Sequence, residues 1–364
     1  MKYKNLILRD GVDLYFDEEL NTAIFVFLAT RKKVKVLVDS DLLLIVSKMD
    51  GSKDLKEYLD DFNLETFRVE NFFKLVEFLY HKNILIEKNW IDLLDFDKNY
   101  KELYDRQFKY LLDITDDGIQ GIEKVQKRIY NTKVAIFGLG AVGASTLKEL
   151  AMLGFVDFIL IDYDTIDYQD VSRNILFNNQ RLDEKKITLA KEMLLKINPD
   201  IKVSTVFETL DINTNLDFID DCDLIINSAN TPYIGYTSIK LSRYCIKANK
   251  LLFICGGFDA HLASLGELIV PGETPCSDCY TTYFTETLKD WKPIKHPIEN
   301  REKVFGGLIS LSLFSASVAV LTILKYFIDG NTSELSRRGE FLFDDYSIYE
   351  FNVPRDENCL FCAN

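Results

Sequence analysis

The sequence predicts an α/β protein in which a doubly wound sheet follows a small N-terminal α+β module. Residues 133–164 combine a strand, a glycine loop, a helix and a second strand that ends in an acidic residue. Residues 131–270 alternate between strand-like and helix-like patterns, which is typical of a parallel sheet. Residues 1–90 follow a different pattern. The chain has 364 residues, enough for two or three domains.

The glycine loop follows an apolar run at 134–137 and reads Gly138, Gly140 and Gly143, in the spacing G-x-G-x-x-G. The first glycine permits a tight strand-to-helix turn, the second lets backbone N–H groups approach a phosphate, and the third lets the helix pack closely on the strand. Asp162 lies 24 residues after Gly138, where its carboxylate can accept hydrogen bonds from a ribose. The pattern favours nucleotide binding, with a purely structural Rossmann-like turn as the alternative.

The remaining elements of the doubly wound domain are placed by their periodicity. Strands are expected near 133–137, 157–161, 201–206, 223–228, 251–255 and 264–270, and helices near 143–153, 184–197 and 232–248. Residues 307–328 form the longest apolar stretch. Because this stretch is rich in serine and ends in charged residues, we interpret it as a buried helix rather than a membrane span.

Residues 1–90 are predicted to form a winged-helix-like module. Short apolar runs at 5–8, 12–16 and 22–27 suggest a small antiparallel sheet, and three helices are expected at 40–49, 55–61 and 68–81, with a returning strand at 84–86. The third helix carries an apolar stripe of Phe72, Phe73, Val76, Phe78 and Leu79. Residues 91–130 are a charged, aromatic connector to the doubly wound domain of residues 131–364, and they contain Tyr104-Asp-Arg106-Gln107.

Two C-x-x-C pairs predict a metal site. Cys276 and Cys279 follow a turn, and Cys359 and Cys362 lie near the end of the chain. Four thiolates form a closed tetrahedral zinc site, which is structural because no position is left open. A redox pair is the alternative. The other cysteines, Cys222, Cys245 and Cys255, stand in apolar contexts and are expected to be inert core residues.

Composition excludes several classes of protein. The 47% hydrophobic and 27% charged residues are ordinary for a globular chain. With 57 acidic and 43 basic residues the net charge is −14, and no basic run suggests nucleic-acid binding. The N-terminus does not resemble a signal peptide. We therefore expect a cytoplasmic protein with no membrane or nucleic-acid partner.

Several motifs together resemble one enzyme family. They are Gly138-Leu-Gly-Ala-Val-Gly143, Leu160-Ile-Asp-Tyr-Asp164, Val171-Ser-Arg173-Asn174, Lys186, Val270-Pro-Gly-Glu-Thr-Pro-Cys-Ser-Asp-Cys279 and the final C-x-x-C. Over about residues 100–364 the chain resembles the ThiF/MoeB/ubiquitin-activating adenylyltransferases. Within them it is most similar to the MccB-type, microcin C peptide-nucleotidylating enzymes. The resemblance implies a homodimer, ATP and magnesium, a ribosomal precursor peptide as substrate, and a peptide clamp in residues 1–90.

The resemblance also implies roles for particular residues. The three glycines shape the phosphate loop, and Asp162, with Asp164 two residues on, binds the nucleotide. Arg173 and Lys186 neutralise the β- and γ-phosphates. Arg106, from the segment that resembles the family's Y-x-R-Q, reaches the phosphates from the other subunit and stabilises the charge on the attacked α-phosphate.

The chain departs from the family pattern at three positions. Asp170 stands where the family usually has Asn, and Asn174 where it has Gln. Asn230 replaces the magnesium-binding Asp and offers only a neutral oxygen. Asp164, Asp170 or Asp259 is the candidate to compensate. No cysteine stands out as a thioester nucleophile, which argues against transfer of a ubiquitin-like partner.

Three functions remain open at this point. The first is ATP-dependent adenylation of a ribosomally made peptide in microcin-like natural-product biosynthesis, with Arg106, Arg173, Lys186 and Asn230 as catalytic residues. The second is a catalytically silent leader-peptide-binding scaffold that presents a precursor to another enzyme, which Asn230 favours. The third, activation of a sulfur carrier, fits the core motifs but leaves residues 1–90 unexplained.

Overall fold

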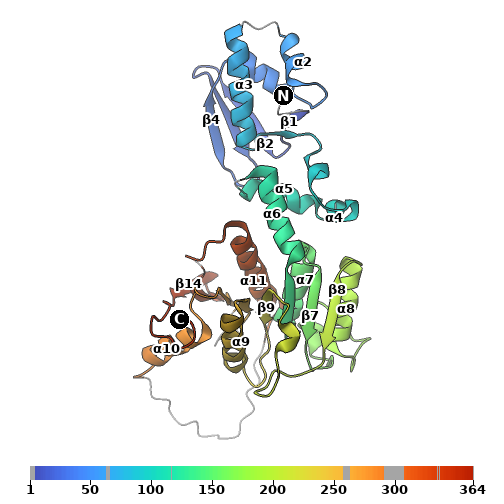
Figure 1. The fold of residues 1–364 in the computed structure, drawn as a ribbon, viewed down its shortest axis with the longest axis vertical. Helices are drawn as coiled ribbons and strands as arrows, with labels where there is room; N and C mark the ends of the chain where they lie inside the picture. The colour runs from blue at the N-terminus through green and yellow to red at the C-terminus, as the bar shows by residue number, and fades with distance from the viewer. Residues whose placement is uncertain are drawn as a thin grey trace. The chain divides into compact units, whose positions relative to one another are not determined.

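The computed structural model describes residues 5–62, 66–115, 117–256, 263–290, 307–333, 335 and 337–363. The chain divides into two compact units, Met1–Gln126 and Lys127–Asn364. In Figure 1 the first is coloured blue to teal and the second green to red. Most of the predicted connector therefore belongs to the first unit.

The second unit is built on a six-stranded sheet in the order β12-β10-β9-β6-β7-β8. Its strands are β6 (Lys133–Phe137), β7 (Asp157–Ile161), β8 (Lys202–Val206), β9 (Leu224–Asn227), β10 (Leu251–Ile254) and β12 (Glu267–Ile269). All pair in parallel except β12, which runs antiparallel to β10. The chain leaves β6 on one side and returns to β9 on the other, so the strand order reverses between β6 and β9. This confirms the doubly wound prediction, and in sheets of this kind ligands bind where the strand order reverses.

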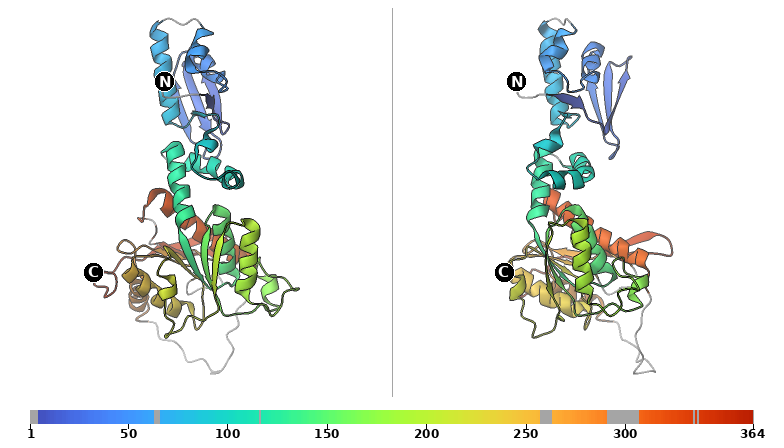
Figure 2. Two further views of the ribbon diagram at one scale, coloured as in Figure 1. Left: turned by 45° about the vertical axis from the view of Figure 1, so that its right-hand side comes forward. Right: turned by 90° about the vertical axis from the view of Figure 1, so that its right-hand side faces the viewer.

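Helices cover both faces of this sheet (Figure 2). They are α7 (Ala141–Leu153), α8 (Lys186–Ile197), α9 (Ile234–Ala248), α10 (Ser277–Thr287) and α11 (Ile309–Asp329), with short 3₁₀ turns η2 (Asp170–Ser172) and η3 (Asp217–Ile219). On one face, Leu241 and Cys245 of α9 share a core cluster with Phe137 and Ile161 of the strands. On the other face α7 packs against both α8 and α11. The layering holds the loops after the strands in fixed positions.

Helix α11 has the length and composition of a membrane span, with a mean hydropathy of 1.9 over 18 residues. In the structure it packs along α7 and buries Ala316, Ala319 and Ile323. Its opposite side is open, and Leu321 is 62% exposed. The predicted buried helix is therefore buried along one face only, as a packed helix of the second unit.

The predicted single strand at 264–270 is wrong. It is broken at Gly266, which has φ +68° and is so close to the Ile254 carbonyl that no side chain fits. The first part, β11 (Ala263–Ser264), pairs with β13 (Arg337–Leu342), which also pairs with β14 (Ser347–Asn352). This second, three-stranded sheet was not predicted. Glycine at a positive φ turns the chain out of one sheet and into another.

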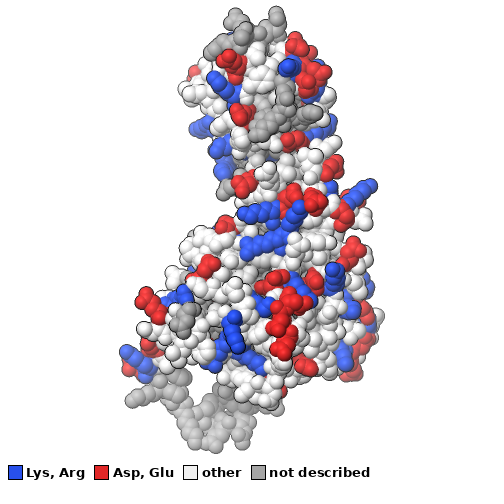
Figure 3. Space-filling view, viewed as in Figure 1, with Lys and Arg blue, Asp and Glu red and all other residues white. Residues whose placement is uncertain are grey.

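The first unit has two separate sheets, whereas a single sheet was predicted. β1 (Leu6–Leu8) pairs with β5 (Leu85–Glu87), and β2 (Val12–Asp17), β3 (Thr22–Phe27) and β4 (Lys33–Leu37) form an antiparallel sheet. The prediction missed β4, although its alternation of Lys and Val is a strand pattern. Val34 and Val36 face the core, and Lys33 and Lys35 are exposed. Figure 3 shows basic side chains along the side of this unit where Figure 1 draws β4.

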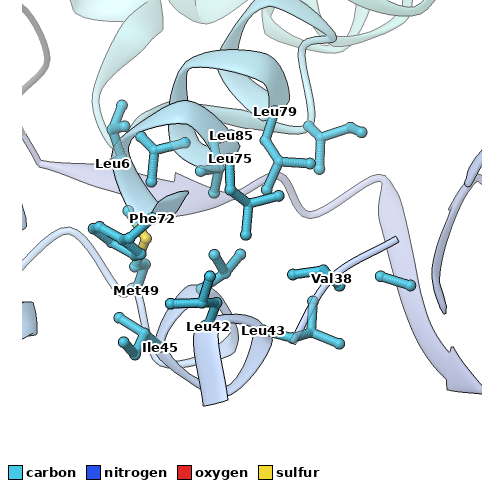
Figure 4. Close-up of a cluster of buried hydrophobic side chains, with 14 of the residues drawn as sticks. Leu6, Val38, Leu42, Leu43, Ile45, Met49, Phe72, Leu75, Leu79 and Leu85 are labelled. Carbon is cyan, nitrogen blue, oxygen red and sulfur yellow. The ribbon is translucent and has the colours of Figure 1, made fainter. Parts of the chain in front are cut away.

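The core of this module lies between the sheet and three helices, α1 (Ser40–Ser47), α2 (Leu55–Asp60) and α3 (Thr66–His81). Figure 4 shows Phe72, Leu75 and Leu79 of α3 directed toward Leu42 and Leu43 of α1. Of the apolar stripe predicted on this helix, three side chains are buried, Phe73 is half-buried and Phe78 is 39% exposed; the buried ones are Phe72, Val76 and Leu79.

The first unit ends in helices. A 3₁₀ turn η1 (Trp90–Leu93) leads into α4 (Lys98–Leu103), α5 (Asp105–Ile114) and α6 (Gly118–Asn131), whose residues from Lys127 on belong to the second unit. Gln126 of α6 donates to the Tyr100 hydroxyl at 2.7 Å and accepts from Gln107 at 2.8 Å. These bonds within the unit fix the helix that carries Arg106.

Candidate functional site

The glycine loop lies at the sheet's reversal point, between β6 and α7. Gly138 has φ +86°, and a Cβ there would lie 2.8 Å from the backbone nitrogen of Ala229, in the loop after β9. A Cβ on Gly143 would overlap the Gly138 carbonyl oxygen. Both positions therefore exclude any side chain. Gly140 is different, because nothing lies within 4 Å of the place its Cβ would take.

The first turn of α7 presents backbone donors to this open space. Its N-cap is Gly140, which supplies no side-chain hydrogen bond, and the first turn contains no acidic residue. The first N–H groups of a helix have no partners within the helix, and the helix dipole adds partial positive charge there. The arrangement suits an anion such as a phosphate.

Asp162, directly after β7, is tied to the glycine loop. Its carboxylate accepts hydrogen bonds from the N–H groups of Leu139 at 2.5 Å and Asp164 at 2.7 Å. Burial raises the pKa of Asp162, while those two hydrogen bonds and the charge of Lys186 act in the opposite direction. Since the carboxylate has further lone pairs, it can also accept from ribose hydroxyls at the edge of the loop.

Lys186, the first residue of α8, is buried among carboxylates. Its Nζ lies 3.0 Å from Asp170 Oδ2 and 3.4 Å from Asp164 Oδ2. Burial alone lowers the pKa of Lys186, but Asp170, Asp164 and Asp162 together raise it above the usual value. The lysine is therefore held as a cation beside the glycine loop.

Asp170 joins both predicted phosphate-binding cations. It is 1% exposed and pairs with Lys186 and, at 3.0 Å, with Arg173, whose own side chain is 51% exposed. Asn174, the neighbouring departure, donates from Nδ2 to the Leu139 carbonyl at 3.1 Å and so supports the glycine loop. Because two cations already occupy Asp170, Asp164 is the more accessible carboxylate for a magnesium ion. Asp259 lies outside the described residues.

Asn230 is exposed in the loop after β9, which packs against Gly138. Buried Asn227 positions this loop by donating to Thr237 and Ser238 and by accepting from the Ala229 N–H. The structure thus brings the loops after β6, β7 and β9 together at one edge of the sheet, and the last of them contains Asn230.

Arg106 is an exposed residue of α5 in the first unit. It lines a cavity of about 1060 Å³ that is formed entirely by first-unit residues. Its predicted contact with a nucleotide stays a prediction.

The four predicted metal ligands meet in one buried cluster, although 80 residues separate Cys279 from Cys359. Sulfur–sulfur distances are 3.8 Å for Cys276–Cys279, 3.6 Å for Cys276–Cys359 and 3.4 Å for Cys279–Cys362. Four Zn–S bonds of about 2.3 Å place sulfurs about 3.8 Å apart, whereas a disulfide needs about 2.05 Å. The cluster fits a tetrahedral metal ion.

The remaining cysteines are buried and free, in keeping with the expected core role. Burial raises the pKa of the Cys222 and Cys255 thiols to about 12 and that of Cys245 further. Such thiols are protonated near neutral pH and are poor nucleophiles.

Comparison with known proteins identifies the family. Residues 104–359 match the ThiF family. The chain belongs to the ThiF family. This membership confirms the predicted family resemblance. One relative is the NEDD8-activating enzyme E1 catalytic subunit of Schizosaccharomyces pombe, 29% identical over 167 residues, which are 45% of this chain and 36% of that protein.

Another relative is the adenylyltransferase and sulfurtransferase UBA4 of Lodderomyces elongisporus, 25% identical over 67% of this chain and 52% of that protein. The matches thus span about half or less of the length of these ThiF-family relatives. Among solved structures, E. coli MccB with ATP aligns with a TM-score of 0.70 and 21% identity over 99% of both chains. At this identity, the likeness to MccB establishes a shared fold.

Sequence reasoning missed two features of the candidate site. Asp170 was noted as a departure, but its pairing with Lys186 and Arg173 was not foreseen. The Tyr163 hydroxyl lies 3.0 Å from the Thr231 hydroxyl, joining the loops after β7 and β9. The Asp170–Lys186 and Tyr163–Thr231 contacts have no sequence signal, because each joins segments that meet only in the folded structure, whereas Asp170 and Arg173 are three residues apart.

Proposed function

We propose that this ThiF-family chain catalyses ATP-dependent adenylation of a ribosomally made peptide in natural-product biosynthesis. The observation that carries the proposal is the arrangement of side chains and backbone groups at the sheet's reversal point. There a helix N-terminus, Asp162 and the buried cation Lys186 lie beside a loop in which Gly138 and Gly143 leave no room for a side chain and the space at Gly140 is open. E. coli MccB, which shares the fold, has been solved with ATP and with MccA.

In the proposed reaction a carboxylate or carboxamide oxygen of the peptide attacks the α-phosphorus of ATP. The bond between the α-phosphorus and the bridging oxygen breaks, and pyrophosphate leaves with the electron pair. The helix N-terminus and Gly140 accommodate the phosphates, and Asp162 orients the ribose. Lys186 and Arg173 neutralise the charge that accumulates on the leaving group. Magnesium, when bound beside Asn230 and Asp164, would shield the phosphates further.

Titration calorimetry with Mg-ATP tests the nucleotide site. We expect Asp162→Ala to weaken ATP binding, with Asp167→Ala as a matched control, since Asp167 is exposed on the same loop. Pyrophosphate exchange in the presence of a peptide then tests the reaction. Absence of ATP binding at millimolar concentration in the intact protein would refute the proposal.

The alternative function is a leader-peptide-binding scaffold that no longer consumes ATP. Asn230 favours it, because a neutral oxygen holds magnesium less well than a carboxylate. Asn230→Asp should tighten Mg-ATP binding if the magnesium site is impaired. If ATP binds but no pyrophosphate exchange appears in either variant, the scaffold function is supported instead.

We also propose that the protein is a cytoplasmic homodimer in which Arg106 of one chain reaches the nucleotide of its partner. Support comes from its exposure on α5 and its place in the segment that resembles Y-x-R-Q. Mixing Arg106→Ala with Asp162→Ala chains should restore part of the activity, because each mixed dimer contains one intact site. Heterodimers without recovered activity would place Arg106 in its own chain's site.

We propose that the four-cysteine cluster holds one structural zinc ion. Support comes from the buried, tetrahedral-scale spacing of its sulfurs. The site has no room for a substrate ligand, so its role is to tie the C-terminal tail to α10.

The peptide clamp is proposed to be the module of residues 1–90, with the peptide added as a strand to the β2-β3-β4 sheet. Both β2 and β4 are edges of that sheet among the described residues. The half-buried Phe73 and exposed Phe78 of α3 are the apolar side chains left for pockets. A chain lacking residues 1–90 should lose peptide affinity while retaining ATP binding.

A further inference from the structure

The β4 edge of the first unit has an unusual charge. Arg31, Lys32, Lys33 and Lys35 fall within five residues and are all exposed, in a chain whose net charge is −14. Within the described part of the chain, no ion pair involves any of them. Acidic side chains stand instead on the opposite edge strand, β2, where Asp13 is exposed. The sheet therefore has one basic edge and one acidic edge.

The backbone of β4 has hydrogen-bonding groups free at this basic edge. Phe27 N–H donates to the Lys32 carbonyl, and Phe25 stands opposite Val34 in the same register. Bonded pairs alternate along an antiparallel ladder, so the groups of Val34 and Val36 point toward β3. Those of Lys33, Lys35 and Leu37 point to the open side, where an added strand would bond.

The side chains of β4 alternate as strictly as its backbone groups. Val34 and Val36 pack against the core cluster that contains Phe72 and Val76 of α3. Lys33 and Lys35 stand on the opposite, exposed face of the sheet. An added strand shares this alternation, because cross-strand neighbours lie on the same face. Its residues beside the lysines would lie on the exposed face, and those between them beside the valines.

We infer that β4 binds an extended peptide segment in which acidic residues alternate with apolar ones. The inference rests on the proposed peptide clamp and specifies its ligand. Acidic residues at alternate positions would face Lys33 and Lys35, and the intervening apolar residues would extend the surface of Val34 and Val36.

A second copy of the chain and a nucleic acid are less suitable occupants of this basic edge. Lysines on an edge strand discourage pairing between copies of the same chain. That effect excludes a second β4 as the occupant, since lysines would face lysines, but it does not oppose an acidic strand. A nucleic acid would be attracted by the charge, but it cannot use the alternating valines or the free backbone groups of the edge.

The test uses fluorescence polarisation with the full chain and three synthetic peptides that alternate Val with Glu, Ser or Lys. The Glu peptide should bind about tenfold more tightly than the Ser peptide at low salt, and less so at 0.5 M salt, as expected for two exposed cross-strand ion pairs. Lys33→Glu with Lys35→Glu should weaken Glu-peptide binding by about tenfold and reverse the preference toward the Lys peptide. N-methylation of alternate peptide amides should abolish binding.

The matched control is Lys56→Glu with Lys82→Glu, which makes the same change in net charge at exposed positions outside the sheet. An equal loss of Glu-peptide binding in this control would overturn the inference, since only net charge would matter. Equal binding of the Glu and Ser peptides would overturn the charge requirement and leave the clamp intact. If no peptide binds while calorimetry still shows ATP binding, the clamp and this inference both fail, and nucleotide binding stands.

Discussion

Replacing Asp170 by Asn should lower the stability of the protein and raise its affinity for ATP. Asp170 is 1% exposed and pairs with Lys186 and Arg173, each at 3.0 Å. A phosphate at the glycine loop would compete with this carboxylate for the same two cations. Removing its charge therefore weakens the folded state but frees the cations for the nucleotide.

The two effects can be estimated separately. Losing one partner of a buried pair costs about 3–5 kcal/mol, but Asp164 still lies 3.4 Å from Lys186 and the Asn oxygen still accepts, so we expect about 1–3 kcal/mol. For nucleotide binding, a phosphate on the far side of the Lys186 ammonium would lie about 6 Å from the Asp170 carboxylate. The repulsion between these two negative charges is about 3 kcal/mol at an effective dielectric of about 20, and the substitution removes it. With solvent screening we expect ATP to bind about tenfold more tightly.

Thermal unfolding and titration calorimetry measure these two quantities. The midpoint of thermal unfolding should fall by about 2–12 °C, at about 2–4 °C per kcal/mol. The matched control is Asp167→Asn, an exposed carboxylate three residues away that pairs with neither cation in the structure. If folded Asp170→Asn binds ATP no more tightly than the unaltered protein, or if Asp167→Asn gives the same gain, competition by Asp170 is refuted.

Three further predictions concern other parts of the second unit. Gly143→Ala should lower both stability and ATP affinity, because its Cβ would overlap the Gly138 carbonyl. Gly140→Ala should fold normally and lose only ATP affinity, because the space at its Cβ is open. Equal unfolding midpoints for the two variants would contradict this difference. Metal analysis should find about one zinc per chain, and Cys359→Ser should lose it and unfold at lower temperature, whereas a metal-free protein of unchanged stability would exclude the site. Burial raises the pKa of Glu267 from 4.5 to about 7. Between these two values Glu267 is protonated in the folded protein and ionised in the unfolded one, so the free energy of unfolding falls as the pH rises. Relative to Glu267→Gln the fall should be about 3 kcal/mol, and parallel stability–pH curves would contradict it.

Several elements were predictable because their signals are local. The strands β6, β7, β9 and β10 are short, mostly apolar runs, and α7 begins at a glycine loop and ends at Gly154. The missed elements had weaker local signals. Two of the five residues of β4 are lysines, and β13 and β14 form a polar hairpin whose partner β11 lies about 70 residues earlier.

The candidate site likewise has features that the sequence predicted and features that it did not. The glycines, Asp162 and the two C-x-x-C pairs were found by spacing, since each motif lies within a few dozen residues and its chemistry depends on that spacing. Sequence alone did not reveal that Asp170 joins Lys186 to Arg173.

The sequence by itself determined the class of fold, the position of the glycine loop and the four cysteines that cluster in the structure, because these depend on short-range periodicity and on residues with unique chemistry. Only the tertiary structure decided which charges meet. The three carboxylates around Lys186 come from the end of β7 and from the turn η2. The open edge of β4 exists because, among the described strands, β4 pairs with β3 alone. The burial of these side chains and their ion pairs depend on contacts between separate segments of the chain, and those contacts form only when the chain folds.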